Sequence, residues 1–306
     1  MIRASTMEAF RTPMTHILSI IANPAQTPLD QDFRDALHLA FPDNAVTELA
    51  PGIAYELPIA KPNPKTYAAA KTALSDRPAD INIVPVANRR KRLLIADMDS
   101  TIIEQECIDE IADYAGKRDE IADITERAMR GELDFDAALK QRVWMLKGLD
   151  ETVLAETFEQ RITLTPGAKT LVETMKSTGA VTALVSGGFT YFTSRVAKAA
   201  GFQFTQANEL LIADGALTGH VAVPILGRTA KQSALIRIAG NHEIPMEDTI
   251  AVGDGANDLS MLGRANLGVA FRAKPAVAKA ADARIDHGDL TALLYLQGMP
   301  QTEFIN

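Results

Sequence analysis

The spacing of hydrophobic and polar residues changes along the chain and divides it into two parts. Before residue 88, segments that read as strands and as amphipathic helices follow one another in the order βαββαβ. The expected strands cover residues 16–22, 45–50, 53–60 and 81–87, and the expected helices cover residues 29–41 and 63–75. This order predicts a small α+β domain of the ferredoxin-like kind over residues 14–87. Residues 1–13 lack such a pattern, and we expect them to form a disordered arm.

After residue 88, short apolar runs alternate with helical stretches. The runs lack polar alternation, which is typical of parallel strands that are covered on both faces. They cover residues 92–97, 180–186, 248–253 and 267–271, and two helices between them cover residues 167–177 and 189–200. The pattern predicts an α/β domain with a doubly wound parallel sheet over residues 88–306. In such sheets, ligands bind beyond the carboxyl ends of the strands.

An insertion at about residues 104–164 separates the first two of these strands. It is much longer than the dozen or so residues that a βαβ crossover needs. Apolar residues recur in it at helical spacing, for example Ile108, Ile111 and Ala112. We therefore predict a helical cap over the carboxyl ends of the strands. The basic run Asn88–Arg92, which precedes the sheet domain, is interpreted as a solvated linker.

The composition narrows the class of protein. The chain is 47% hydrophobic and 23% charged, with a formal net charge of −8, which is ordinary for a soluble globular protein. It contains no stripe dense in Lys and Arg, which argues against nucleic acid and anionic membranes as partners. No apolar run approaches the ~18 residues of a membrane span. The single cysteine, Cys107, excludes an internal disulfide and fits a cytoplasmic protein.

Two carboxylates mark the end of the first strand of the sheet domain. Asp97 and Asp99 directly follow the apolar run Leu93–Ala96. Because like charges repel and desolvation is costly, a buried strand that ends on paired acids needs a reason. A divalent cation is one reason, and a nucleophile beside a proton donor is another. Ser186 and Asp254 also follow predicted strands, so we expect the sheet to bring these groups together.

Four separated motifs line up along the chain. They are Asp97-Met98-Asp99-Ser100-Thr101, Val185-Ser186-Gly187-Gly188, Lys231 after Gly227-Arg228-Thr229-Ala230, and Gly253-Asp254-Gly255-Ala256-Asn257-Asp258. Together they resemble the haloacid dehalogenase-like phosphatases. Longer strings resemble the phosphoserine phosphatases among them, notably Glu106-Cys107-Ile108-Asp109-Glu110-Ile111-Ala112. The resemblance covers about residues 90–300 and implies a haloacid dehalogenase-like Rossmannoid core.

The two aspartates of the first motif have separate expected roles. Asp97 is the predicted nucleophile, because a carboxylate can attack phosphorus and form an aspartyl-phosphate. Asp99 is the predicted general acid and then base, which protonates the leaving oxygen and later deprotonates water. The alternative is that Asp99 caps the following turn, or that both acids only bind metal.

Magnesium is the expected cofactor, since Mg²⁺ prefers hard oxygen ligands and often uses few carboxylates. The resemblance implies three ligands, which are the side chain of Asp97, the backbone carbonyl of Asp99 and the side chain of Asp254. Such an ion would screen the repulsion between a carboxylate and a phosphate. Asp258 is either a further ligand or a residue that orients the loop, and the second role is favoured.

The remaining motifs are expected to bind the phosphate. Ser186 and the amides of Gly187 and Gly188 are predicted to form a cradle at a helix N-terminus. Lys231 would offset the charge on the phosphoryl group and on Asp97, and Asn257 would donate to the phosphate or position Lys231. Taken alone, Ser-Gly-Gly reads as an N-cap, and a single Lys reads as a surface residue.

Substrate choice is expected to come from the cap. Phosphoserine carries an ammonium and a carboxylate besides its phosphate. The resemblance implies that Glu106 and Arg142 bind these two groups, and Arg suits a carboxylate because its planar fork reaches both oxygens. It also implies that Met129 and Phe135 close over the substrate. Without the resemblance, Glu106 and Arg142 would read as ordinary solvated helix charges.

The resemblance thus implies Mg²⁺-dependent hydrolysis of O-phospho-L-serine to L-serine and phosphate, the last step of serine biosynthesis by that route. Three alternatives stay open: phosphoryl transfer to homoserine, a phosphatase of broader specificity, and a sensing or scaffold protein with an inactive site. The N-terminal βαββαβ order resembles ACT-like regulatory domains, which bind amino acids or dimerise. A structural role or a homodimer through this domain is slightly favoured over serine binding.

Overall fold

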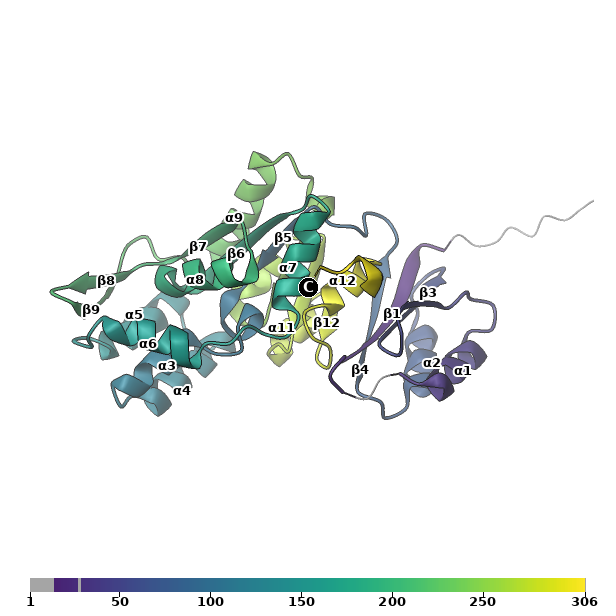
Figure 1. Cartoon of the computed structure of the whole chain (residues 1–306), viewed down its shortest axis with the longest axis horizontal. Coiled ribbons are helices and arrows are strands. Elements are labelled where there is room, and N and C mark those ends of the chain that lie inside the picture. The colour runs from purple at the N-terminus through teal and green to yellow at the C-terminus, as the bar shows by residue number, and fades with distance from the viewer. Residues whose placement is uncertain (1–13, 27–28, 306) are drawn as a thin grey trace, which may run out of the picture.

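The structure is a computed structural model, and it describes residues 14–26 and 29–305. In this part of the chain, the strands form one four-stranded, one six-stranded and one two-stranded sheet. Figure 1 shows the four-stranded sheet with its two helices at one end of the molecule, and the other sheets and helices beyond α12 (Ala292–Leu296). The arm predicted over residues 1–13 lies outside the described residues. The domain boundaries proposed from the sequence stay predictions.

The N-terminal sheet has the predicted order of elements. Its strands are β1 (His16–Ala22), β2 (Thr47–Ala50), β3 (Ala54–Ile59) and β4 (Ala79–Pro85), and its helices are α1 (Gln31–Ala40) and α2 (Pro64–Leu74). The strands pair antiparallel in the order β2-β3-β1-β4. Both helices begin at a side-chain cap, because Asp30 accepts from the Phe33 amide and Asn63 accepts from the Thr66 amide.

Both faces of the N-terminal sheet are buried, and strand β1 shows how. Leu18 and Ile20 point toward α1 and α2, while Ile17 and Ile21 belong to the main core together with residues of α12 (Ala292–Leu296). Side chains alternate between the two faces of a strand. A strand that is covered on both sides must therefore be apolar at nearly every position, as residues 16–22 are.

Polar contacts fix the N-terminal sheet to the six-stranded sheet. Asn82 on β4 accepts from the amide of Arg284 at 2.8 Å and donates to its carbonyl at 2.9 Å. The Asn82 side chain thus makes the two hydrogen bonds to edge strand β12 (Ala283–Ile285) that the backbone of a neighbouring strand would otherwise make. Beside it, the Asp80 carboxylate accepts from the backbone amides of Asp286 and Gly288, each at 2.8 Å.

The interpretation of residues 88–92 as a solvated linker is wrong for two of its members. The Arg89 guanidinium donates to the carbonyls of Tyr295 and Leu296, and it pairs with Glu56 on β3. Lys91 is 4% exposed. Arg89 thus saturates two carbonyl groups at the carboxyl end of α12, where free carbonyl groups attract positive charge. The Lys91 ammonium instead donates to the carbonyls of Asn88 and Glu247.

The six-stranded sheet confirms the predicted fold class. Its strands are β5 (Leu93–Ala96), β6 (Val181–Phe189), β7 (Phe204–Asn208), β10 (Thr249–Gly253), β11 (Leu267–Phe271) and β12 (Ala283–Ile285). All neighbours are parallel, in the order β12-β11-β10-β5-β6-β7. The strand order reverses between β5 and β10, which is where doubly wound sheets bind their ligands. The two edge strands, β7 and β12, were not predicted.

Helices cover the two faces of this sheet. On one face lie α7 (Ala168–Ser177), α8 (Thr190–Ala200) and α12. On the other lie α9 (Arg228–Asn241), α10 (Leu259–Leu262) and α11 (Pro275–Ala280). In β5, Leu94 belongs to the first layer of the core and Leu93 to the second. Among the described residues, no helix has the length and apolar character that crossing a membrane requires.

The insertion after β5 forms the predicted helical cap. It contains α3 (Cys107–Tyr114), α4 (Arg118–Met129), α5 (Phe135–Met145) and α6 (Thr152–Arg161). A hairpin of β8 (Leu210–Ala213) and β9 (Ala216–Val221) extends this cap and lies beside α5 (Figure 1). The backbone joins them, since the Gly148 amide donates to the Leu217 carbonyl at 2.8 Å.

Candidate active site

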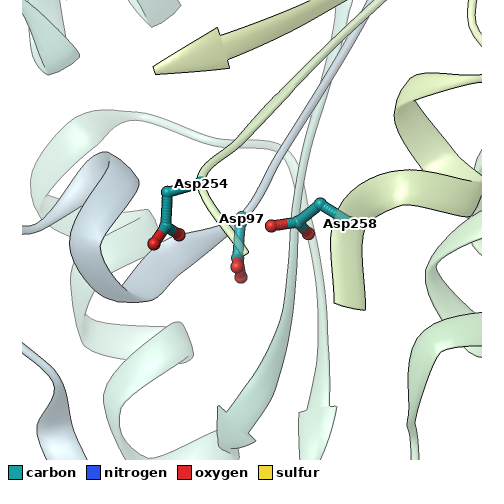
Figure 2. Close-up of side chains that lie close together, drawn as sticks. All are labelled: Asp97, Asp254 and Asp258. Atoms are coloured by element: carbon teal, nitrogen blue, oxygen red, sulfur yellow. The ribbon is translucent and has the colours of Figure 1, made fainter. Parts of the chain in front are cut away.

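Three carboxylates meet where the strand order of the large sheet reverses. Asp97 follows β5, Asp254 follows β10, and Asp258 lies in the short helical turn after it. Carboxylate oxygens of all three lie within 4.8 Å of one another. Figure 2 shows the three side chains directed toward a common point. The convergence of Asp97 and Asp254 follows from the parallel sheet, because both strands end at the same edge.

A lysine from α9 joins this cluster. The Nζ atom of Lys231 lies 2.7 Å from an oxygen of Asp97 and 2.7 Å from an oxygen of Asp258. The side chain is 2% exposed. Burial disfavours its charge, but the two carboxylates outweigh burial and raise the pKa of Lys231. Lys231 therefore stays a cation beside Asp97, as the sequence predicts.

Asp258 makes the contacts of an orienting residue. One oxygen accepts from Lys231, and the other accepts from the Gly255 amide at 3.2 Å. These bonds hold the loop that carries Asp254. By contrast, among the described residues the one hydrogen bond to the Asp254 carboxylate is a long one of 3.4 Å from the Thr101 hydroxyl.

The donor set fits a hard divalent cation. Burial and then the charge of Asp258 raise the pKa of Asp254 to about 7, and the same two causes raise the pKa of Asp97 well above its usual range. Three buried carboxylates beside one lysine leave excess negative charge, which a cation would relieve. The side-chain oxygen of Asn257 is also buried without a hydrogen-bond partner among the described residues. The assignment of Asp97, the Asp99 carbonyl and Asp254 as the metal ligands stays a prediction.

The raised pKa values predict that the metal-free protein loses stability as the pH rises. Asp254 binds its proton up to about pH 7 when folded, against 3.8 when unfolded. The folded state thus holds more protons in this range, so the free energy of unfolding falls with increasing pH. We expect the Tm after EDTA treatment to be at least about 3 °C lower near pH 7.5 than near pH 5. Thermal unfolding followed by circular dichroism measures this.

Magnesium and one variant provide the controls for this pH effect. Saturating Mg²⁺ should raise the Tm more at the higher pH, because the ion binds the ionised carboxylates. Asp254→Asn should make the metal-free Tm depend less on pH between pH 5 and pH 7.5. The comparison stops near pH 7.5 because burial lowers the pKa of Lys91 to about 8. Above that pH, the titration of Lys91 would also change the stability. A metal-free Tm that is equal at both pH values would contradict the proposed origin.

Asp99 joins the core to the cap. One carboxylate oxygen accepts from the Cys107 amide at 2.9 Å, at the start of α3. The other accepts from the Ser186 hydroxyl at 3.1 Å. The carboxylate is 8% exposed and lines the cavity together with Asp97. Both aspartates of the first motif therefore face the same small space.

The Ser-Gly-Gly motif is placed differently from the prediction. Strand β6 continues to Phe189, and α8 begins only at Thr190, so Gly187 and Gly188 lie in the strand end rather than at the helix N-terminus. The Gly188 amide donates to the Ser186 hydroxyl oxygen at 2.8 Å. That amide is thus engaged within the motif, and the Ser186 hydroxyl must turn away from Asp99 before it can join the Gly187 amide in the cradle.

Two side chains of the cap press on glycines of the core. A Cβ atom at Gly187 would lie 2.5 Å from the Phe135 ring, and one at Gly255 would lie 2.7 Å from the Met129 sulfur. Only glycine permits so close an approach. The cavity beneath has a volume of about 20 Å³, which is room for little more than one water molecule. The cap is therefore closed, and a phosphomonoester needs it to open.

The cavity brings together most of the predicted site residues. These are Asp97, Asp99, Glu106, Met129, Phe135, Arg142, Ser186, Gly187 and Asn257. Lys231 pairs with Asp97 at 2.7 Å, and Asp254 lies within 4.8 Å of Asp97, but neither of them is among the residues that line the cavity. The sequence interpretation missed the lining side chains of Ile108, Leu139 and Phe189. The first two occupy apolar positions at helical spacing in the cap, which was the available signal.

Glu106, which is half-buried, and Arg142, which is buried, carry charges of opposite sign in the cap wall. Ser100 donates to Glu106 at 2.7 Å, yet burial and the charge of Asp99 raise the pKa of Glu106 well above its usual range. Burial also lowers the pKa of Arg142, and Glu106 is the first of the groups that oppose this shift. A ligand with one ammonium and one carboxylate could pair its ammonium with Glu106 and its carboxylate with Arg142.

The doubly wound sheet, the cap and the Asp97–Lys231 pair define a haloacid dehalogenase-like hydrolase. In agreement, the family profile described as haloacid dehalogenase-like hydrolase matches residues 94–263. A phosphoserine phosphatase of Streptomyces coelicolor is 44% identical over 239 residues, which are 76% of this chain and 58% of that protein. One of Idiomarina loihiensis is 46% identical over 202 residues, 66% of this chain and 91% of the relative. The chain belongs to the phosphoserine phosphatase family.

A solved structure supports the same grouping. The phospho-aspartyl intermediate analogue of a phosphoserine phosphatase is similar with a TM-score of 0.65 and 42% identity, over 67% of this chain and 98% of the other. The chain spans little more than half the length of the curated relative from Streptomyces coelicolor. What the relatives act on is therefore a starting point for a proposal about this chain.

Proposed function

We propose that this chain hydrolyses O-phospho-L-serine to L-serine and phosphate through an aspartyl-phosphate at Asp97, as the last step of a serine-forming pathway. The observation that carries the proposal is one closed cavity with Asp97 and Asp99 at its base and Glu106 and Arg142 in its cap wall. The relatives named above, including the phospho-aspartyl analogue, support it.

The chain's own residues account for both chemical steps. The Asp97 carboxylate attacks phosphorus, the bond from phosphorus to the serine oxygen breaks, and Asp99 gives that oxygen a proton. Asp99 then takes a proton from water, the water oxygen attacks phosphorus, and the bond to Asp97 breaks. Lys231 holds Asp97 in place, while Ser186, Gly187 and Asn257 donate to the phosphate oxygens.

The proposed cofactor is Mg²⁺, held by the side chains of Asp97 and Asp254 and the carbonyl of Asp99. When bound, it supplies positive charge between the carboxylate and the phosphate. The decisive experiment measures phosphate release from phosphoserine, phosphoethanolamine and an aryl phosphate, with Mg²⁺ or with EDTA. We expect phosphoserine to be preferred and EDTA to abolish turnover. Equal rates on all three would favour broad specificity, and phosphohomoserine formed from added homoserine would favour a transferase.

Arg142→Ala should impair the hydrolysis of phosphoserine selectively. The variant loses the guanidinium that would bind the substrate carboxylate, so kcat/KM for phosphoserine is expected to fall by about 10–100-fold. An aryl phosphate has no such carboxylate, and its kcat/KM should change less than about threefold. Steady-state assays of both substrates measure the difference. Arg127→Ala, on the exposed side of α4, is the matched control, and equal losses on both substrates would contradict the contact.

For the N-terminal module, the ACT-like identity, the homodimer and the amino-acid site are proposals as well. The core already occupies one face of its sheet. Helices α1 and α2 therefore provide the surface on which a second subunit would dock.

A further inference from the structure

A buried polar contact joins three helices of the cap beside the active site. Asp109 lies on α3, Thr125 on α4 and Arg142 on α5. The Thr125 hydroxyl oxygen is 2.7 Å from Asp109 and 3.0 Å from the Arg142 guanidinium. Thr125 and Arg142 are each 3% exposed. None of the four sequence motifs contains Thr125, and the proposed reaction assigns no role to Asp109 or Thr125.

The direction of these hydrogen bonds follows from the chemistry of the groups. A guanidinium can only donate, so the Thr125 oxygen must accept from Arg142. The hydroxyl then has one proton left, and the Asp109 carboxylate is its nearest acceptor, closer than the Ile121 carbonyl at 3.0 Å. Asp109 therefore orients the hydroxyl, and the hydroxyl presents its lone pair to Arg142.

Two bonds together fix the plane of the guanidinium. Besides the bond to Thr125, the Nε atom of Arg142 donates to the Ala138 carbonyl at 3.2 Å. The same side chain lines the cavity together with Asp97. A planar fork binds a carboxylate well only when its orientation is fixed in advance, because freezing a long side chain costs free energy.

We propose that Thr125 is a positioning residue for substrate recognition, with Asp109 orienting its hydroxyl, so that Arg142 is held ready for the carboxylate of an amino-acid phosphate. The inference rests on the function proposed above. In this role, Asp109 and Thr125 determine substrate specificity through the orientation of Arg142. In a purely structural role, the same contact would only hold the cap helices together.

Thr125→Val tests the proposal, because valine keeps the shape and removes the hydroxyl. We expect KM for phosphoserine to rise about tenfold with kcat within twofold, since a hydrogen bond to a charged group is lost. Phosphoethanolamine lacks the carboxylate, and its kcat/KM should stay within twofold. Thr125→Ser restores the hydroxyl and should bring KM for phosphoserine back to within threefold of the original.

The cap contains a matched control. Thr157 on α6 is fully buried, and its hydroxyl has no hydrogen-bond partner in the described part of the chain. Thr157→Val should therefore leave both substrates unaffected. If Thr125→Val fails to fold, Asp109→Ala replaces it, with KM for phosphoserine expected to rise about threefold or more because the hydroxyl loses its orientation.

The outcomes separate this inference from the proposed function. An unchanged KM in a folded Thr125→Val protein would overturn the positioning role. Equal losses on phosphoserine and phosphoethanolamine would also overturn it, because they would indicate a general disturbance of the cap. If the unaltered protein shows no preference for phosphoserine, the proposed function itself fails, before any variant is compared.

Discussion

Asp97→Asn is expected to lower the rate of phosphate release by about 10⁴-fold or more while the fold survives. The amide has nearly the same shape as the carboxylate, but its oxygen is a poor nucleophile toward phosphorus. The substitution removes one of three crowded carboxylates, and Asp258 remains to pair with Lys231. Because burial already raises the pKa of Asp97, the neutral side chain should leave the metal-free Tm equal or higher.

The measurement combines turnover with trapping of the intermediate. The unaltered protein, quenched with acid during turnover, should contain phosphate bound to one aspartate, and hydroxylamine should release it. Asp97→Asn should show neither turnover nor this adduct. Asp113→Asn, which alters an exposed carboxylate of the cap, is the control with normal activity. Near-normal turnover of Asp97→Asn would remove Asp97 from the role of nucleophile.

Asp99→Asn is expected to lower kcat for phosphoserine by about 10²–10⁴-fold, the usual worth of a general acid or base. The asparagine oxygen can still accept from the Cys107 amide, and the Ser186 hydroxyl can turn to accept from its NH₂ group. The hydrogen bonds between core and cap should therefore persist. The ability to give a proton to the leaving oxygen and to take one from water is lost.

The leaving group provides an internal test of this role. A nitrophenolate departs without a proton, so the first step should be much less affected with an aryl phosphate than with phosphoserine. The second step still needs a base, and the phosphorylated protein should accumulate. Rapid-quench measurements would show a burst of nitrophenolate followed by slow turnover. The same loss in the first step for both substrates would contradict the general-acid assignment.

The sequence was sufficient to predict the four central strands of the large sheet and the convergence of Asp97 and Asp254 at their ends. Buried parallel strands such as Leu93–Ala96 are apolar runs that end in functional side chains, and this signal is local. The edge strands β7 and β12 escaped prediction for the opposite reason. β12 has three residues, and β7 carries exposed positions such as Phe204, so neither has a long apolar run.

Long-range contacts explain what else was missed. Arg89 and Lys91 read as solvated charges because nothing near them in the sequence shows that α12 offers its last carbonyls to Arg89. Thr125 reads as an ordinary helix residue, since its partners lie on two other helices. The extent of strand β6 beyond Gly187 likewise depends on its neighbour, Asn208 of β7, which pairs with Phe189.

The two-sided burial of strand β1 also limits how the chain can be shortened. The stretch shared with the relative from Idiomarina loihiensis is 202 residues long and makes up 91% of that protein. In this protein, the first sheet shares its core with the helices of the large domain. A fragment that starts at residue 93 would lack β1 and would expose to water the apolar face of α12 that packs against it. A shortened catalytic fragment of this chain would therefore need polar substitutions on that apolar surface.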